Sequence, residues 1–222
     1  MTASDWIGRT LNYIRTDGVE AGLQKSSREF RHGLARRIDP YLDGTAIFNR
    51  DWDVLVVLDA CRPDLLAEAA DSYDFLTNSP PTIRSKGSGS RSWMERNFTS
   101  EWSSEMKSTA YITGNPFSDE LVPPGSFGLL DEVWRYGWDD EVGTIPARPI
   151  TDRAIDVGRN GDFDRMLIHY MQPHFPSIPD PLGTEIKLQT FGEGWESVWD
   201  DLESGELPTD RVWESYRLNL EY

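Results

Sequence analysis

The sequence predicts an α/β protein with a mainly parallel sheet and flanking helices. Residues 53–60 read DVLVVLDA, a short continuous apolar run ending in a carboxylate, which is typical of a strand buried on both faces of a parallel sheet. Two further strands are predicted at 108–114 (STAYITG) and 166–172 (MLIHYMQ), and helical patterns at 61–70 and 150–159 lie between the strands. Such strand–helix–strand alternation predicts parallel pairing with helices on both faces.

The length of 222 residues fits one domain with a sizeable core. We divide the chain into an N-terminal helical segment, residues 1–45, and an α/β domain, residues 46–222. Within the first part, residues 4–16 and 19–38 carry helical spacing with many Arg on the remaining faces. We expect these two helices to pack on the domain edge or on a partner rather than to lie in a membrane interface.

The α/β part continues with recognisable elements. Residues 61–70, CRPDLLAEAA, begin a helix in which Pro63 fits the first turn. A Gly/Ser-rich stretch at 77–92 leads into a short helix at 93–98, WMERNF.

The C-terminal part contains two further segments. Residues 193–206 are acidic and are expected to form a solvated insertion. Residues 208–222 predict an amphipathic helix with Val212, Tyr216 and Leu220 on one stripe. Because no capping residue follows this helix, we expect an incomplete domain.

Ligands of parallel α/β sheets bind at the carboxyl ends of the strands, which here carry Asp59, the turn 113–118 and the turn 172–176. Asp59 would be a costly buried charge without a partner, so a divalent cation or an Arg is expected beside it. The alternative is that Asp59 caps the helix that follows.

Two other segments carry groups suited to catalysis. Residues 87–93, GSGSRSW, place small residues and hydroxyls before a helix, where free N–H groups favour an anion. Ser88 or Ser90 could act as a nucleophile if a metal lowers the hydroxyl pKa, whereas the alternative is a flexible loop. In HYMQPHFP, His169 is interpreted as a satisfied core residue, and His174 as the group that touches a substrate oxygen or protonates a leaving group.

Taken together, WDVLVVLDACRPD, GSGSRSWMERNF, YITGNPFS and HYMQPHFP resemble, in that order, the alkaline phosphatase superfamily, and specifically its sulfatase-like hydrolases and transferases of haloarchaeal type. The resemblance covers roughly residues 50–222. It implies that Asp59 binds a divalent cation (Ca, Mg, Mn or Zn), that Ser88 or Ser90 is the nucleophile, and that His174 contacts the transferred group.

Two departures from the family pattern affect this interpretation. CRPDL at 61–65 only superficially resembles the sulfatase Cys-x-Pro-Ser-Arg motif, so we interpret Cys61 as a structural thiol. The family also supplies a second metal-binding cluster from its C-terminal half, whereas this sequence has no His after His174. Asp59 and a serine are too few ligands for a catalytic cation.

The function expected from the resemblance is therefore a metal-dependent hydrolase or transferase of sulfate or phosphate esters that is inactive or weak as this chain. Arg62, Arg91 and Asn115 are assigned to substrate binding, on a small-molecule, glycan or lipid ester. One alternative is a non-catalytic binding or assembly module, with an oligomer or partner at the exposed sheet edge. Another is a phosphotransferase acting on lipid or glycan head groups.

Charge and composition exclude other classes. With 22 Lys and Arg against 38 Asp and Glu, the net charge is −16, so nucleic acid would meet a repelling surface. A single Cys cannot form an internal disulfide, and the N-terminal sequence lacks the apolar run of a secretory signal. We expect a cytoplasmic chain without a membrane span.

The basic residues include only four Lys, at positions 25, 86, 107 and 187, among 22 Lys and Arg. An acidic, Lys-poor surface suits a salt-rich cytoplasm, in which ions screen the self-repulsion. We therefore interpret the chain as halophilic and expect it to unfold on dialysis into dilute buffer, as followed by circular dichroism. Full stability in that buffer would contradict this interpretation.

Overall fold

The computed structural model describes residues 19, 44–79, 81–182, 201–202 and 204–222. The chain separates into two compact units, Met1–Gly44 and Thr45–Tyr222, and the fold below is that of the second unit. The helices predicted at 4–16 and 19–38 lie outside the described residues, apart from Val19, and so does most of the acidic segment 193–206.

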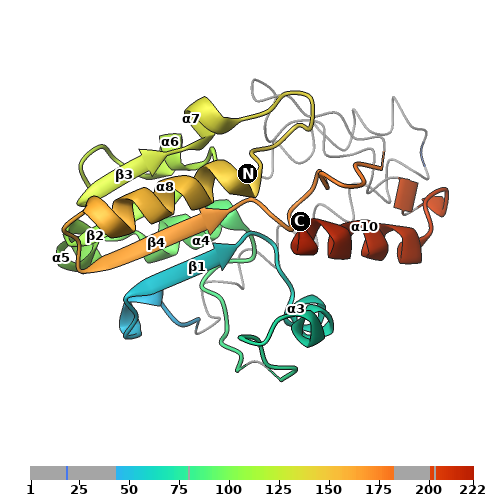
Figure 1. Ribbon diagram of the computed structural model, residues 1–222, viewed down its shortest axis with the longest axis horizontal. Coiled ribbons are helices and arrows are strands. Elements are labelled where there is room, and N and C mark those ends of the chain that lie inside the picture. The colour runs from blue at the N-terminus through green and yellow to red at the C-terminus, as the bar shows by residue number, and fades with distance from the viewer. Residues whose placement is uncertain (1–18, 20–43, 80, 183–200, 203) are drawn as a thin grey trace. The chain divides into compact units, whose positions relative to one another are not determined.

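The core of this unit is a four-stranded parallel sheet, with strand order β1-β4-β2-β3 (Figure 1). The strands are β1 (Val54–Leu58), β2 (Thr109–Thr113), β3 (Leu129–Glu132) and β4 (Arg165–Tyr170). The α/β class and the parallel pairing predicted from the sequence are confirmed. Strand β3 was not predicted, because its four residues lack a long apolar run.

Helices connect and cover these strands. They are α3 (Pro63–Ala69), α4 (Ser90–Asn97), α5 (Ser103–Lys107), α6 (Ser118–Leu121), α7 (Trp134–Gly137), α8 (Ala147–Asn160) and α10 (Thr209–Glu221). Short 3-10 helices are η2 (Ile47–Asn49), η3 (Ala70–Ser72) and η4 (Ser100–Trp102). The predicted helices at 61–70, 93–98, 150–159 and 208–222 are all present, with shifted ends.

The two faces of the sheet build two apolar clusters. Helix α8 covers one face, where Ile150 and Val157 pack with Ile112 of β2 and Ile168 of β4 (Figure 1). The alternation of side chains along a strand sends the neighbouring residues to the opposite face. There Tyr111 and Leu167 are fully buried among residues of η2, α4 and α5.

The first strand corrects one sequence-based expectation. Within the described residues β1 is an edge strand that pairs with β4, and Val54 and Val56 are 51% and 50% exposed. Only Leu55 and Val57 pack against the cluster on the other face. The expectation that this strand is buried on both faces is therefore wrong, because α8 lies over β4 and β2 and does not extend over β1 (Figure 1).

Helix α10 also differs from expectation. The sequence predicted an apolar stripe of Val212, Tyr216 and Leu220, but the buried residues of α10 are Val212, Ser215 and Asn219. Tyr216 and Leu220 are only partly buried. The helix is thus amphipathic in an unusual sense, since two of its three buried side chains are polar.

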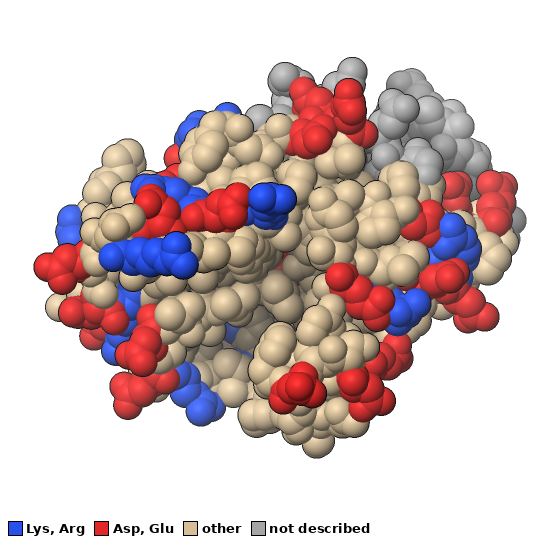
Figure 2. All heavy atoms as spheres, viewed as in Figure 1, with Lys and Arg blue, Asp and Glu red and all other residues tan. Residues whose placement is uncertain are grey.

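Acidic and basic side chains are spread over the face seen in Figure 2, separated by uncharged surface. Among the described residues, no helix has both the length and the apolar character needed to cross a membrane.

The buried centre of the sheet yields a first stability prediction. Leu167→Ala removes a fully buried side chain from β4, so it should lower the free energy of unfolding by about 2–5 kcal/mol. Val56→Ala on the half-exposed face should cost clearly less, because less buried apolar surface is lost. Urea unfolding measures both values, and equal losses would contradict the assignment of β1 as an open edge.

Candidate functional site

Asp59 stands at the carboxyl end of β1, where the chain turns away from the sheet. Its backbone N–H donates to the carbonyl of Tyr170 at 3.1 Å, which continues the parallel ladder one residue beyond the strand. The residue is only 7% exposed. The next residue, Ala60, has a φ of 60°, in the left-handed region that a side chain disfavours. The turn therefore holds a buried carboxyl group at the rim of the sheet.

Ser90 begins helix α4 and faces this carboxyl group. Its hydroxyl lies 2.9 Å from Oδ1 and 2.8 Å from Oδ2 of Asp59 and donates to the carboxylate. Ser88 is exposed, and within the described residues no hydrogen bond joins it to Asp59. The sequence left the two serines as alternatives, and the structure brings Ser90 to the acid.

The Gly/Ser-rich loop before α4 is closely packed at one point. A Cβ on Gly87 would lie 2.3 Å from the backbone nitrogen of Trp93, so any side chain there would displace the first turn of α4. Ser92 adds a contact between its hydroxyl and the backbone of Gly89. Gly87 is thus required by close approach, and it helps to fix where Ser90 begins the helix.

Asn115 supports Asp59 from the turn after β2. Its side-chain NH₂ donates to Oδ2 of Asp59 at 2.6 Å, and its carbonyl oxygen accepts the backbone N–H of Phe117 at 3.0 Å. The residue is almost fully buried. The sequence assigned Asn115 to substrate binding, whereas the structure shows its amide engaged with Asp59 and with its own turn.

His169 is the residue of this cluster that sequence reasoning missed. It is buried, as expected for a core residue, but its Nε2 lies 3.4 Å from Oδ2 of Asp59, and its Nδ1 lies 3.0 Å from the hydroxyl of Tyr111. Burial raises the pKa of Tyr111 well above its ordinary value, so the hydroxyl keeps its proton. A carboxylate only accepts, so a hydrogen on Nε2 faces Asp59.

The charge of Asp59 follows from these neighbours. Burial is the largest single influence and raises its pKa, but the hydrogen-bonding and charge contacts of His169, the charge interaction with His174 and the Ser90 hydroxyl together lower it by more. The resulting pKa is about 2, below the ordinary value of 3.8. Asp59 is therefore ionised at neutral pH.

His174 lies in the turn after β4, which contains cis peptide bonds before Pro173 and Pro176. Its charge is near enough to Asp59 to lower the pKa of that acid. Its Nδ1 lies 2.6 Å from the carbonyl oxygen of Phe175, an acceptor, so Nδ1 carries a hydrogen. The residue is partly buried, and its charge interaction with Asp59 indicates that the two side chains lie near the same edge of the sheet.

The two arginines assigned to substrate binding have carboxylate partners. Arg62 is paired with Asp64 at 2.5 Å and stacks on the ring of Trp213. Arg91 makes a two-pronged ion pair with Glu120, with distances of 2.7 and 2.6 Å. Neither pair involves Asp59, so the structure does not bring these arginines into the Asp59 cluster.

The remaining sequence-based interpretations concern Cys61 and capping. Burial, with a smaller contribution from Asp64, raises the pKa of Cys61 to about 11, so the sulfur stays a thiol at neutral pH, as a structural role requires.

Helix α3 has no side-chain cap at its N-terminus, and Arg62 is its N-cap residue. The alternative that Asp59 caps this helix is therefore wrong.

A divalent cation does not fit the described residues alone. Asp59 and Ser90 together offer oxygen atoms that could bind a cation. Asn115, however, directs its NH₂ group toward Asp59, and an NH₂ group is not a cation ligand. Over the described ranges, no group of three His, Cys, Asp or Glu side chains could hold a metal ion. Zn²⁺ usually takes at least three protein ligands and Ca²⁺ takes six to eight oxygens. These residues would therefore need further ligands to retain a cation.

Comparison of the chain with protein-family models, with curated proteins and with solved structures found no match.

The lowered pKa of Asp59 predicts a specific loss of stability in acid. The native state favours the ionised form, so the stabilisation is complete above the ordinary pKa of 3.8 and is lost as the pH falls through about 2. Wild type should lose about 2 kcal/mol more unfolding free energy than Asp59→Asn across this interval. Urea unfolding at several pH values measures it, and parallel curves for the two proteins would contradict it.

Proposed function

We propose that this chain carries the nucleophile of a serine-dependent hydrolase or transferase of sulfate or phosphate esters, on an α/β fold of the alkaline phosphatase and sulfatase type. The observation that carries the proposal is the contact of the Ser90 hydroxyl with both carboxylate oxygens of Asp59, at 2.8 and 2.9 Å. A nucleophile within hydrogen-bonding distance of a base is the arrangement that covalent catalysis uses. The order of the sequence motifs agrees with this arrangement.

In the proposed step, Ser90 Oγ forms a bond to the phosphorus or sulfur of the ester, and the bond from that atom to the alcohol oxygen breaks. The hydroxyl proton passes to Asp59, and the leaving alcohol takes a proton from His174 or water. A water molecule then forms a bond to the same phosphorus or sulfur and gives up one proton to the group that protonated the alcohol. The bond to Ser90 Oγ breaks as Asp59 returns its proton to that oxygen. When an acceptor alcohol replaces water, the same atoms perform transfer, which includes transfer to lipid or glycan head groups.

The charge of Asp59 argues for weak activity of this chain. A carboxyl group with a pKa of about 2 holds a proton poorly, so Asp59 alone is a weak general base. In the resembling family a divalent cation (Ca, Mg, Mn or Zn) supplies the missing activation by lowering the hydroxyl pKa. Since Asp59 and Ser90 are an incomplete ligand set, we expect little or no turnover.

A second candidate function is a non-catalytic binding or assembly module. It is supported by β1, which is an edge strand of the sheet among the described residues and whose Val54 and Val56 are half exposed. Parallel sheets are normally covered on both faces, and open edges are sites where another strand adds. If this second function is correct, the Asp59 cluster stabilises the fold and takes no part in catalysis.

A single-turnover experiment tests the proposed function. The purified chain is incubated with p-nitrophenyl phosphate or p-nitrophenyl sulfate and one of the four cations, and the serine adduct is located by peptide mass spectrometry. We expect a small amount of adduct on Ser90, with little or no steady release of nitrophenol. Ser90→Ala should abolish the adduct, and Asp59→Ala should strongly reduce it, because Asp59 accepts the Ser90 proton in the proposed step.

Ser88→Ala is the matched control, because it removes a hydroxyl from the same loop and leaves Asp59 untouched. It should react like wild type. An adduct on Ser88 would disprove the role of Ser90, and no adduct with any cation would favour the binding module. Steady cation-dependent turnover would refute the expectation of weak activity.

A further inference from the structure

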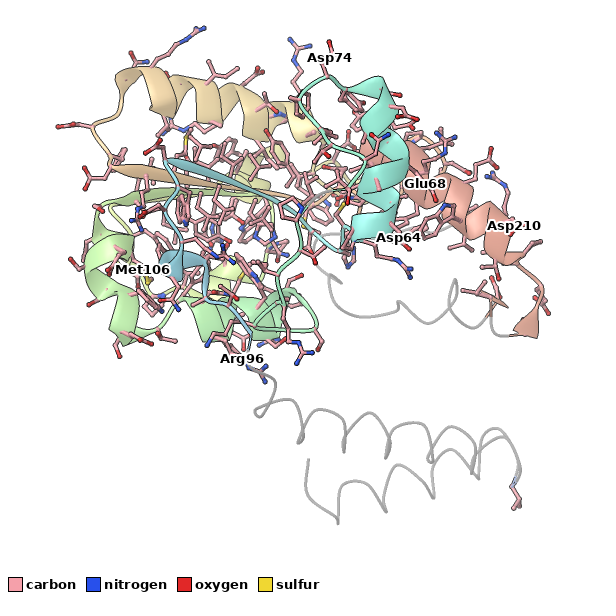
Figure 3. The ribbon with its side chains drawn as sticks, turned by 90° about the horizontal axis from the view of Figure 1, so that it is seen from below. Asp64, Glu68, Asp74, Arg96, Met106 and Asp210 are labelled. Atoms are coloured by element: carbon pink, nitrogen blue, oxygen red, sulfur yellow. The ribbon has the colours of Figure 1, made fainter. Side chains whose placement is uncertain are left out.

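Four aromatic side chains, which we call the aromatic quartet, dock helix α4 on the sheet. In Figure 3, α4, marked by Arg96, lies on the side of the sheet opposite to α8. The ring centre of Trp93 on α4 lies 5.7 Å from that of His169 on β4 and 5.6 Å from that of Phe98, the C-cap residue of α4. Tyr111 on β2 closes the circuit, with its ring centre 5.2 Å from Phe98 and 6.3 Å from His169.

His169 is the member of the quartet that contacts Asp59. Its Nε2 lies 3.4 Å from Oδ2 of Asp59, and its Nδ1 lies 3.0 Å from the hydroxyl of Tyr111. Tyr111 is fully buried, and burial raises the pKa of its hydroxyl so far that the proton stays on the oxygen. When this hydroxyl donates to Nδ1, the hydrogen of the imidazole is on Nε2 and faces the carboxylate.

Helix α4 contacts both His169 and Asp59. Ser90 and Trp93 are three residues apart on α4, so their side chains lie on one face of the helix. The Ser90 hydroxyl lies 2.9 and 2.8 Å from the two carboxylate oxygens of Asp59, and the ring of Trp93 packs edge-on against that of His169. One buried imidazole therefore contacts both the acid and the helix that carries the hydroxyl.

The contacts on Oδ2 restrict how the carboxylate of Asp59 can turn. The torsion that orients a carboxylate has a broad energy profile, so neighbouring donors decide where its oxygens point. Asn115 and His169 both contact Oδ2, one from the turn after β2 and the other from β4. The orientation that Ser90 meets is thus set from the sheet side of the site.

We infer that His169 is a positioning residue of the candidate site, whose Nε2 hydrogen restrains the Asp59 carboxylate while its ring, packed on Trp93, holds the first turn of α4. The Ser90 hydroxyl thereby meets both carboxylate oxygens. The value of this arrangement for a reaction rests on the proposed function, in which Asp59 takes the Ser90 proton. His169 acts through Asp59 and not on the ester itself.

Two variants separate this positioning role from packing. The double variant Tyr111→Phe/His169→Phe keeps four rings in the quartet and leaves no hydroxyl buried without a partner, but it removes the Nε2 hydrogen. His169→Gln loses one ring, whereas its amide can still donate to Asp59 and accept from Tyr111. The two variants thus remove opposite halves of what His169 provides.

The rate of adduct formation on Ser90 is measured with p-nitrophenyl phosphate or p-nitrophenyl sulfate and the same four cations. The double variant should form the adduct about threefold to tenfold more slowly than Tyr111→Phe alone, the effect of one hydrogen bond. His169→Gln should recover most of this loss. A role in packing alone predicts the reverse order, because only His169→Gln lacks a ring.

A second measurement needs no ester and no variant of the quartet beyond the one used for assignment. In the full chain labelled with ¹⁵N at histidine, long-range ¹H–¹⁵N spectra report whether Nε2 of His169 carries a hydrogen. His169→Gln assigns this signal among the three histidines of the chain. Wild type should show a hydrogen on Nε2. Ser90→Ala should shift the signal, because Ser90 and His169 share the carboxylate of Asp59, and the matched control Ser88→Ala should leave it unchanged.

A wild-type His169 without a hydrogen on Nε2 would overturn the inference, and so would a His169 signal that is the same in Ser90→Ala and Ser88→Ala. A His169→Gln variant as slow as the double variant would also overturn it. If no protein forms an adduct but the His169 signal responds to Ser90→Ala, the proposed function fails and the positioning role stands. If Ser90 reacts equally fast in the double variant and in Tyr111→Phe, the positioning role fails alone.

Discussion

The ionised carboxylate of Asp59, almost fully buried at the end of an edge strand, is the constraint to which the rest of the site responds. Removing such a charge from water is costly unless donors replace the water. Here the donors come from the start of α4, the turn after β2 and the end of β4, through Ser90, Asn115 and His169. Three segments that are distant in sequence thereby each place a side chain beside the carboxylate oxygens of Asp59.

The parallel topology makes this convergence possible. The carboxyl ends of parallel strands lie at one edge of a sheet, so the turns after β1, β2 and β4 meet there. Gly114 brings two of them close, because its backbone N–H donates to the carbonyl of His169 at 2.8 Å. A Cβ on Gly114 would lie 2.6 Å from Cδ1 of Ile150 and 2.9 Å from Cγ2 of Ile145, so a side chain there would displace these two buried residues.

Local sequence patterns predicted much of this arrangement. The apolar run before Asp59 and the glycines before Ser90 mark the strand and the helix that carry the central contact, because both depend on neighbours in sequence. The position of β4 between β1 and β2 does not depend on neighbours in sequence, so local patterns do not predict it. The sequence therefore predicted His169 only as a core residue, because it is the strand order that brings its ring beside Asp59.

The exposure of β1 and the polar face of α10 were missed for related reasons. An apolar run does not reveal whether a helix extends over both sides of its strand, and Val56 is left half exposed. Helical periodicity predicts which face of α10 is buried only when apolar side chains mark it. Ser215 and Asn219 are buried because the backbone of a distant turn needs donors and acceptors.

The charge state of Asp59 is the most direct test of this account. A ¹³C-detected titration of the Asp59 carboxyl group in the folded chain measures it. The account predicts a midpoint of about 2 in wild type and a higher midpoint in Ser90→Ala, which removes one of the contacts that favour the ionised form. A wild-type midpoint at the ordinary value of 3.8, unaffected by Ser90→Ala, would contradict it.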